Sequence, residues 1–255
     1  MWENLILDVQ DGLAFVTLNR TKQLNALNEK LAVELGECAD KIIQEQDKID
    51  VVIIAGSGDR AFVAGADIGE MLRMDPQQAI AFARLLHQTN TKLDSLPQPV
   101  IASINGFCLG GGNELAIACD IRIASDKSKF GQPEVGLGIT PGAGGTQRLP
   151  RLIGPGRAKY MDYTGEIIDA KTALEWGLID ILVPEAELKD KVLAVAKKIQ
   201  SQRRFAVRQV KQCIRLGKDA ALEAALEIEV QAFSMCFTHP DRTEAMGAFV
   251  NKSKK

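Results

Sequence analysis

The stretch PVIASINGFCLGGGNELAIACDIRIASDKSKFGQPEVGLGITPGAGG, residues 99–145, places two carboxylates beside glycine-rich backbone. Its apolar run Val100–Ile104 ends at an Asn-Gly turn, which predicts a buried strand. Three consecutive glycines follow, and a helix-like run then has Glu114 in its first turn. A second apolar run, Ile121–Ala124, leads into a glycine-rich segment that contains Glu134. Each glutamate therefore lies near the end of an expected strand.

A similar order of elements occurs earlier in the chain. The β-branched run Val51–Ala55 is followed by a glycine-containing loop and a helix-like segment, about fifty residues before the corresponding elements of the first stretch. Leu13–Leu18 predicts a further strand, and residues 28–46 show helical spacing with Asn28 as the N-cap. This alternation of strands and helices predicts an α/β fold with largely parallel strands.

The last hundred residues are predicted to be mainly helical, with Ile179–Val183 as their only strand-like run. The segment 220–235 has apolar residues around much of its circumference, which is typical of either a core helix or a subunit interface. The helices are expected at residues 159–164, 169–177, 187–200, 206–215 and 220–234.

The composition is that of an ordinary globular protein. The chain has 255 residues, 46% of them hydrophobic, and a formal net charge of −2 that is dispersed along it. This balance argues against a nucleic-acid or membrane partner. The five cysteines are widely spaced without a CxxC pair, which indicates reduced thiols. Without a signal-peptide pattern or a long apolar run, the protein is expected in the cytoplasm.

Several familiar catalytic and cofactor motifs do not occur. Counted from Gly110, the third glycine of a dinucleotide-binding fingerprint is replaced by Leu115. The sequence has no Gly-Lys-Ser/Thr of a phosphate-binding loop and no G-x-S-x-G nucleophile elbow. The two histidines, His87 and His239, are not in metal-ligand spacing, so no metal site is expected.

The glycine loops and the two glutamates remain as candidates. Gly111 lies at an expected helix start, where backbone N–H groups lack intrahelical partners, and Ala66 of the earlier loop would supply a second donor for an oxyanion hole. Tight packing of helix on strand explains the same glycines equally well. Glu114 and Glu134 stand among apolar residues, where two carboxyls can act on a water as acid and base. A first-turn glutamate that favours the helix dipole is the alternative for Glu114.

Several motifs together carry a resemblance. They are the segments 61–68 (AFVAGADI), 105–115 (NGFCLGGGNEL), 130–142 (FGQPEVGLGITPG), 144–149 (GGTQRL) and 245–249 (AMGAF). Through them the chain resembles the crotonase (enoyl-CoA hydratase/isomerase) family over about residues 5–250. It is most similar to the bacterial short-chain enoyl-CoA hydratases, also called 3-hydroxybutyryl-CoA dehydratases.

The resemblance implies a crotonase-type superhelix of repeated ββα units as the core domain, residues 1–195. It implies a C-terminal α-helical trimerisation region at residues 196–255, and assembly as a homotrimer or a dimer of trimers.

Roles for individual residues also come from the resemblance. Ala66 and Gly111 would hold the thioester oxygen through their N–H groups. Glu114 would orient and deprotonate the attacking water, and Glu134 would exchange the proton at Cα. The remaining substrate-binding positions, along the CoA moiety and the water site, would be Ala64, Gly65, Asp67, Ile68, Gly110 and Gly142.

The implied activity is the reversible syn hydration of short-chain trans-2-enoyl-CoA to 3-hydroxyacyl-CoA. The substrate partner is an acyl-CoA thioester, and no cofactor is expected because CoA is part of the substrate. Having both glutamates favours a hydratase over a Δ3,Δ2-enoyl-CoA isomerase or another enolate-forming member, which is the alternative enzyme. The alternative of another class is a non-catalytic RNA-binding member, against which the net charge argues.

Overall fold

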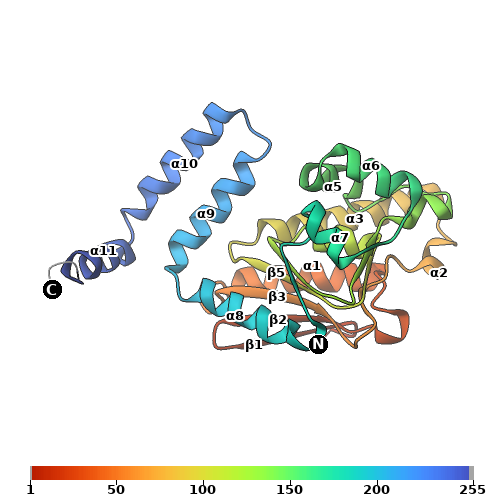
Figure 1. The fold of residues 1–255 in the computed structure, drawn as a ribbon, viewed down its shortest axis with the longest axis horizontal. Helices are drawn as coiled ribbons and strands as arrows, with labels where there is room; N and C mark the ends of the chain where they lie inside the picture. The colour runs from red at the N-terminus through yellow and green to blue at the C-terminus, as the bar shows by residue number, and fades with distance from the viewer. Residues whose placement is uncertain (1, 253–255) are drawn as a thin grey trace.

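The computed structural model describes residues 2–252, and two sheets organise its body (Figure 1). The larger sheet has the order β1-β2-β3-β5-β7-β10, antiparallel between β1 and β2 and parallel elsewhere. The smaller sheet has the order β4-β6-β8-β9. The strands of the larger sheet are β1 (Leu5–Gln10), β2 (Leu13–Leu18), β3 (Val51–Gly56), β5 (Val100–Ile104), β7 (Ile121–Ser125) and β10 (Ile181–Val183). Those of the smaller sheet are β4 (Ala61–Val63), β6 (Phe107–Leu109), β8 (Lys129–Gly131) and β9 (Ile168–Asp169).

A long strand, a short strand and a helical segment follow one another three times. Strand β3 is followed by β4 and α2, β5 by β6 and α4, and β7 by β8 and the 3-10 helix η2. In each case the long strand joins the larger sheet and the short strand joins the smaller one. The expected ββα repeat is thereby confirmed, and the three helical segments follow the ends of neighbouring short strands.

The helices lie on both faces of the larger sheet and beyond its edge (Figure 1). Those of the body are α1 (Glu29–Gln44), α2 (Ile68–Met71), α3 (Pro76–Ser95), α4 (Gly111–Ala116), α5 (Gly145–Ile153), α6 (Pro155–Thr164), α7 (Ala170–Trp176) and α8 (Leu188–Gln200). Three 3-10 helices complete the body: η1 (Thr21–Gln23), η2 (Pro133–Leu137) and η3 (Glu185–Glu187). The C-terminal helices are α9 (Arg204–Gly217), α10 (Leu222–Cys236) and α11 (Pro240–Lys252).

Alternate side chains of the central strands enter two separate cores. On β3, Val52 and Ile54 pack into the main core with α1 and α3, whereas Val51 and Ile53 pack against α8. This two-residue period follows from the pleat of the strand. Burial on both faces explains why β3 is an almost continuous β-branched run.

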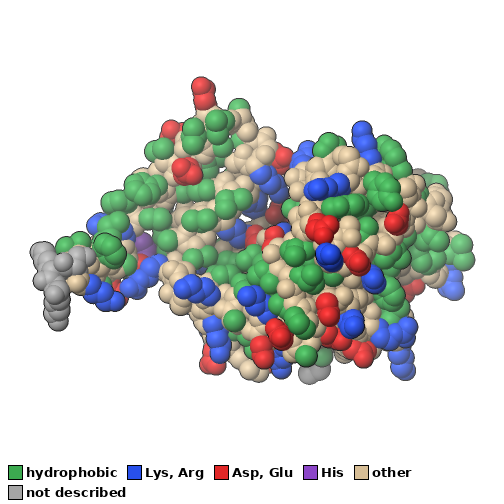
Figure 2. Space-filling view, viewed as in Figure 1, with side chains coloured by type: hydrophobic (Ala, Val, Ile, Leu, Met, Phe, Trp, Pro, Cys, Tyr) green, Lys and Arg blue, Asp and Glu red, His purple; other side chains and the backbone are tan. Residues whose placement is uncertain are grey.

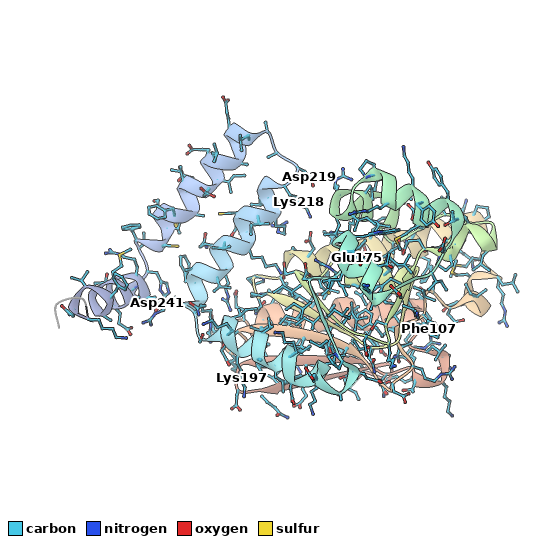
Figure 3. The ribbon with its side chains drawn as sticks, viewed as in Figure 1. Phe107, Glu175, Lys197, Lys218, Asp219 and Asp241 are labelled. Atoms are coloured by element: carbon cyan, nitrogen blue, oxygen red, sulfur yellow. The ribbon has the colours of Figure 1, made fainter. Side chains whose placement is uncertain are left out.

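Helices α9, α10 and α11 extend from the body as an arm (Figure 1). Lys211 of α9 anchors the arm, since its buried Nζ lies 2.9 Å from the carbonyl oxygen of Gln98 and 2.7 Å from Asp120 Oδ2. At the far end of α9, Lys218 and Asp219 approach the body, and Asp219 forms an ion pair with Arg151 of α5 (Figure 3). Helix α8 continues without a break across the expected domain boundary at residues 195 and 196.

Several expected elements change in the structure. Ile179–Val183 was predicted to be the only strand after Pro150. This prediction is wrong, because strand β9 also forms there and pairs antiparallel with β8. Ile168 and Asp169 are too few to show a strand pattern, and the pairing comes from β8. The helix-like run with Glu114 in its first turn, expected at Asn113–Cys119, is helix α4, which begins at Gly111 and ends at Ala116. Within residues 2–252, no helix is both long and apolar enough to cross a membrane.

Candidate active site

A cavity of about 600 Å³ opens where α2, α3, α4 and η2 meet. Nine of the ten predicted site residues line it. The tenth, Asp67, is not among the described residues that line the cavity. The nine are Ala64, Gly65, Ala66, Ile68, Gly110, Gly111, Glu114, Glu134 and Gly142. The two glycine loops and the two glutamates therefore meet at one cavity, although these residues span almost eighty positions of the sequence.

Two backbone N–H groups face this cavity from different loops. The Leu27 N–H donates to the Gly65 oxygen, and the Asp67 N–H donates to the Leu27 oxygen, both at 2.8 Å. Because these bonds flank Ala66 in a parallel bridge, the N–H of Ala66 points away from that bridge. Gly111 is the first residue of α4, and its N–H belongs to the turn that has no intrahelical acceptor. A β-carbon placed on Gly111 would lie 3.7 Å from the nitrogen of Ala66, so the two groups are neighbours.

The three consecutive glycines serve different purposes. A β-carbon on Gly112 would lie 2.1 Å from the carbonyl oxygen of Val63, so this glycine permits tight packing of α4 on β4. Gly110 has a φ of +49°, and a β-carbon there would lie 3.0 Å from Glu134 Oε1. Gly111 has no backbone obstacle of that kind and faces Ala66. The packing explanation therefore holds for Gly112, and Gly111 stays the predicted oxyanion-hole donor.

Glu114 is held by the backbone that precedes and starts α5. It is 2% exposed, and its Oε1 accepts hydrogen bonds from the N–H groups of Ala143 at 2.8 Å and Gly145 at 2.6 Å. Burial raises the pKa of Glu114, and these hydrogen bonds act in the opposite direction by favouring the ionised carboxylate. The bonds fix Oε1 and leave Oε2 for another partner.

Glu134, on η2, is somewhat more exposed than Glu114, and its carboxyl is less supported by hydrogen bonds. It is 9% exposed, and its buried Oε2 has no hydrogen-bond partner within the described part of the chain. Burial is the main cause that raises the pKa of Glu134 to about 7, and the negative charges of Glu114 and Asp162 add to it.

Burial raises the pKa of both carboxyls, and the two differ in their hydrogen-bond donors. Donated N–H bonds stabilise the charged form of Glu114, which is the form that a general base needs. Glu134 lacks such donors on Oε2, and a pKa of about 7 lets it both hold and release a proton near neutral pH, which suits a residue that exchanges protons. With the N–H groups of Ala66 and Gly111 on the same cavity, the arrangement can add a proton and a hydroxyl to a substrate whose carbonyl oxygen is held.

Comparison with known proteins agrees with this geometry. The family model described as "Enoyl-CoA hydratase/isomerase" matches residues 8–255. The chain belongs to the enoyl-CoA hydratase/isomerase family. Its relatives in this family include the crotonyl-CoA hydratase of Syntrophomonas wolfei, which is 44% identical over 99% of this chain and 97% of the relative. The short-chain-enoyl-CoA hydratase of Clostridium acetobutylicum is 45% identical over 98% of this chain and 96% of the relative.

Solved structures of the family show the same fold. The crystal structure of an enoyl-CoA hydratase from Bacillus anthracis superposes with a TM-score of 0.94, at 42% identity, over 98% of this chain and 97% of that one. An enoyl-CoA hydratase structure from Geobacillus kaustophilus gives a TM-score of 0.96 at 36% identity, over 99% and 95% of the two chains. The crotonase-type fold expected from the sequence is confirmed.

Several residues of the cavity escaped the sequence analysis. Helix α2, helix α3 and the segment between them line one part of it with large apolar side chains, which are Met71, Met74, Phe82 and Leu86. Their helical spacing is indistinguishable from that of core residues, so the sequence carried no separate signal for them. The donors to Glu114 are backbone groups, and Asp162 reaches the site only through the packing of α6 on η2.

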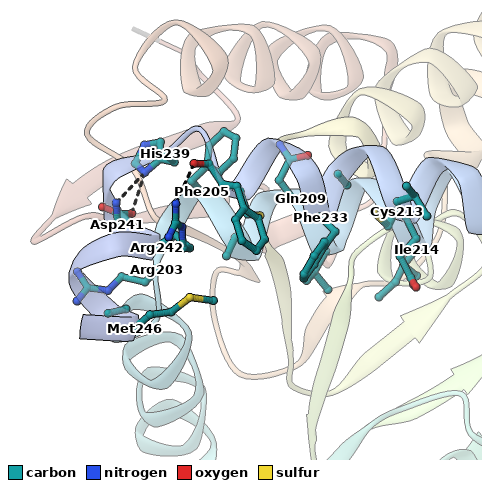
Figure 4. Close-up of a pocket in the computed structure, with 18 residues that line it drawn as sticks. Arg203, Phe205, Gln209, Cys213, Ile214, Phe233, His239, Asp241, Arg242 and Met246 are labelled. Carbon is teal, nitrogen blue, oxygen red and sulfur yellow. Dashed lines mark hydrogen bonds and ion pairs between the residues drawn. The ribbon is translucent and has the colours of Figure 1, made fainter. Parts of the chain in front are cut away.

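A second hollow, of about 890 Å³, lies between the three helices of the arm (Figure 4). Its lining is mainly apolar and includes Phe205, Phe233 and the thiols Cys213 and Cys236. At one end Phe205 stacks on His239, which contacts Asp241 at 3.4 Å. Hydrophobic side chains also cover the outer surface of α9 and α10 (Figure 2). Unlike the first cavity, this hollow does not combine paired carboxyls with free helix-start N–H groups.

Proposed function

We propose that this protein catalyses the reversible syn hydration of short-chain trans-2-enoyl-CoA to 3-hydroxyacyl-CoA. The observation that carries the proposal is that Glu114 and Glu134 line one cavity together with Ala66 and Gly111. Membership in the enoyl-CoA hydratase/isomerase family and the names of the two bacterial relatives support it.

In this reaction the N–H groups of Ala66 and Gly111 donate to the thioester oxygen. Glu114, fixed through Oε1, accepts a proton from water with its free Oε2 as the water oxygen bonds to Cβ. The electrons of the double bond move toward the thioester oxygen as an enolate, and Glu134 then delivers its proton to Cα. One oxyanion donor contributes about 3–4 kcal/mol to such a step. Both carboxyls act from one side of the bound substrate in this proposal, which gives addition to one face.

The substrate brings its own CoA, so the proposal needs no separate cofactor and no metal. Each proton that moves is carried by one of the two glutamates. Among the described residues, no cluster of three His, Cys, Asp or Glu side chains has the arrangement of a metal site.

The test is hydration of crotonyl-CoA by the purified protein, followed as loss of the enoyl-thioester absorbance. We expect turnover with the wild type and a 10²- to 10⁴-fold lower kcat for Glu134→Gln. An exposed glutamate on α7 provides the matched control, Glu175→Gln, which should retain full activity. A wild type without activity on short and medium enoyl-CoA chains would refute the hydratase assignment.

Isomerisation of Δ3- to Δ2-enoyl-CoA is the second candidate, because Glu134 alone is able to remove and return a proton. The two N–H bonds that hold Glu114 favour hydration, since isomerisation does not need an oriented water. Product analysis with a 3-enoyl-CoA separates the two. A protein that forms the 2-enoyl product but no 3-hydroxyacyl-CoA is an isomerase.

We also propose that the protein acts in the cytoplasm as a homotrimer or a dimer of trimers. The exposed apolar residues of α10 support the subunit-interface interpretation of this helix. They are Leu222, Leu226, Val230, Phe233 and Met235. Sedimentation of the purified protein tests the assembly, and a monomer at micromolar concentration would refute it.

A further inference from the structure

A charged pair lies directly behind the loop that carries Ala66. Arg20 follows strand β2, and its Nη2 lies 2.9 Å from Asp67 Oδ2. The side chains are 12% and 26% exposed, so the pair is largely shielded from water. The other guanidinium nitrogen of Arg20, Nη1, donates to the carbonyl oxygen of Ala26. One side chain therefore joins two chain segments that the sequence keeps more than forty residues apart.

The two segments are also joined through their backbones. The N–H of Ala64 donates to the Leu24 oxygen at 3.1 Å, and Leu27 forms the two bonds that flank Ala66. Residues 24–27 therefore act as a template for the loop 64–67. Asn25, within this template, also fixes it to strand β4, since its side chain is 1% exposed and donates to the Ala61 oxygen at 2.9 Å.

Asp67 connects the same template to the start of α2. While Oδ2 contacts Arg20, Oδ1 accepts from the N–H groups of Gly69 at 3.1 Å and Glu70 at 3.3 Å. The hydrogen bond from Arg20 is the main cause that lowers the pKa of Asp67, so this carboxylate stays charged at neutral pH. The residue directly after Ala66 is thus tied on one side to Arg20 and on the other to the α2 N-terminus.

We propose that Arg20 and Asp67 are positioning residues for the oxyanion hole, which hold the N–H of Ala66 in the direction that an enolate oxygen needs. The inference rests on the proposed function and extends it to two residues that lie outside the cavity lining. Neither residue touches the substrate. Their effect passes through the peptide between Ala66 and Asp67.

The geometry explains why arginine is required at this position. Arg20 uses two nitrogens of one planar group to reach the Ala26 oxygen and Asp67 Oδ2 together. A lysine has a single charged nitrogen on a flexible stem and cannot reproduce a fixed two-point contact. Arg20→Lys therefore keeps the charge but loosens the loop.

The test uses acetoacetyl-CoA, whose enolate absorbs in the ultraviolet and carries its negative charge on the oxygen that the hole would hold. We expect Arg20→Lys and Asp67→Asn to raise the apparent pKa of bound acetoacetyl-CoA by about one to two pH units. This equals a loss of about 10- to 100-fold in enolate stabilisation, and kcat for crotonyl-CoA should fall by a similar factor, with little change in KM. Binding of butyryl-CoA, which does not form an enolate at neutral pH, should change by less than threefold.

The exposed pair Lys92–Asp40 provides the matched control, because this ion pair also joins two distant segments, here helices α3 and α1, and neither residue lines the cavity. Lys92→Met should leave the pKa of bound acetoacetyl-CoA and kcat unchanged. Asp67→Asn retains an oxygen that caps α2, so it keeps the fold testable if Arg20→Lys unfolds.

Wild-type values in both variants would overturn the proposal, and so would an equal loss of butyryl-CoA binding, which indicates general damage. A wild type that fails to hydrate crotonyl-CoA refutes the proposed function instead, while the acetoacetyl-CoA titration still tests the positioning of Ala66.

Discussion

Glu134→Gln should make the folded protein more stable at alkaline pH while it abolishes most of the activity. In the folded protein, burial raises the pKa of Glu134 to about 7 from the ordinary value of 4.5. The unfolded chain therefore releases this proton at a lower pH than the folded one. Rising pH favours unfolding of the wild type across that window, and a glutamine has no proton to release.

The magnitude follows from the two pKa values. At about 1.4 kcal/mol per pH unit, ionisation of Glu134 reduces the free energy of unfolding by about 1 kcal/mol at pH 5 and about 3 kcal/mol at pH 8. The advantage of the variant over the wild type should thus grow by about 2–3 kcal/mol between these conditions. Taking the difference between the two pH values cancels any constant effect of placing an amide in the site.

Urea unfolding at equal protein concentration, followed by far-ultraviolet circular dichroism, measures this difference. Glu175→Gln, at an exposed position on α7, is the matched control and should follow the wild type at both pH values. An advantage of Glu134→Gln that is the same at pH 5 and pH 8 would show that the carboxyl is not destabilised by its surroundings. The acid role assigned to it would then lose its physical basis.

The remaining predictions concern the other carboxyl, the glycines, the pH profile and the arm. Glu114→Gln keeps an oxygen for the two backbone donors, so its Tm should equal that of the wild type while kcat falls 10²- to 10⁴-fold. Glu114→Ala leaves two buried N–H groups unpaired, so its free energy of unfolding in urea should be about 2–6 kcal/mol lower. Gly112→Ala places a β-carbon 2.1 Å from a backbone oxygen and should lower the Tm strongly, whereas Gly142→Ala, with open space around it, should not. For hydration, kcat/KM should decrease above about pH 7 as Glu134 ionises, and a profile that stays flat to pH 9 would contradict its acid role. Phe233→Glu should shift the sedimenting species toward the monomer.

The sequence predicted the long strands well because their physics is local. Val100–Ile104 and Leu13–Leu18 form strands with the expected bounds, since apolar β-branched runs buried on both faces suit few other structures. Strands β4, β6 and β8 have three residues each, too few to show alternation, and their formation depends on the neighbours they pair with. Helix α5 was not predicted, because it contains Pro150, which normally ends a helix.

For the site, the two carboxylates and the N–H group at the start of a helix could be predicted from the sequence, whereas the convergence of the residues and the donors to Glu114 could not. Glu114 and Glu134 stood out as carboxylates in apolar surroundings, and the resemblance connected them with Ala66 and Gly111. Their meeting in one cavity depends on the order of β4, β6 and β8 in the smaller sheet, which no local pattern encodes. The N–H groups that donate to Glu114 belong to Ala143 and Gly145, and the side chains of these residues do not indicate a catalytic site.

The five thiols differ in exposure, so their rates of chemical labelling can be used to measure the proposed association of subunits. Cys38, Cys108 and Cys119 are buried, and burial raises the pKa of Cys38 and Cys119 to about 12, so a maleimide should not reach them in the native state. Cys213 and Cys236 line the hollow of the arm and are partly exposed. In the proposed assembly the arm is the subunit interface, so their labelling rate, read by mass spectrometry, should rise with dilution as subunits separate.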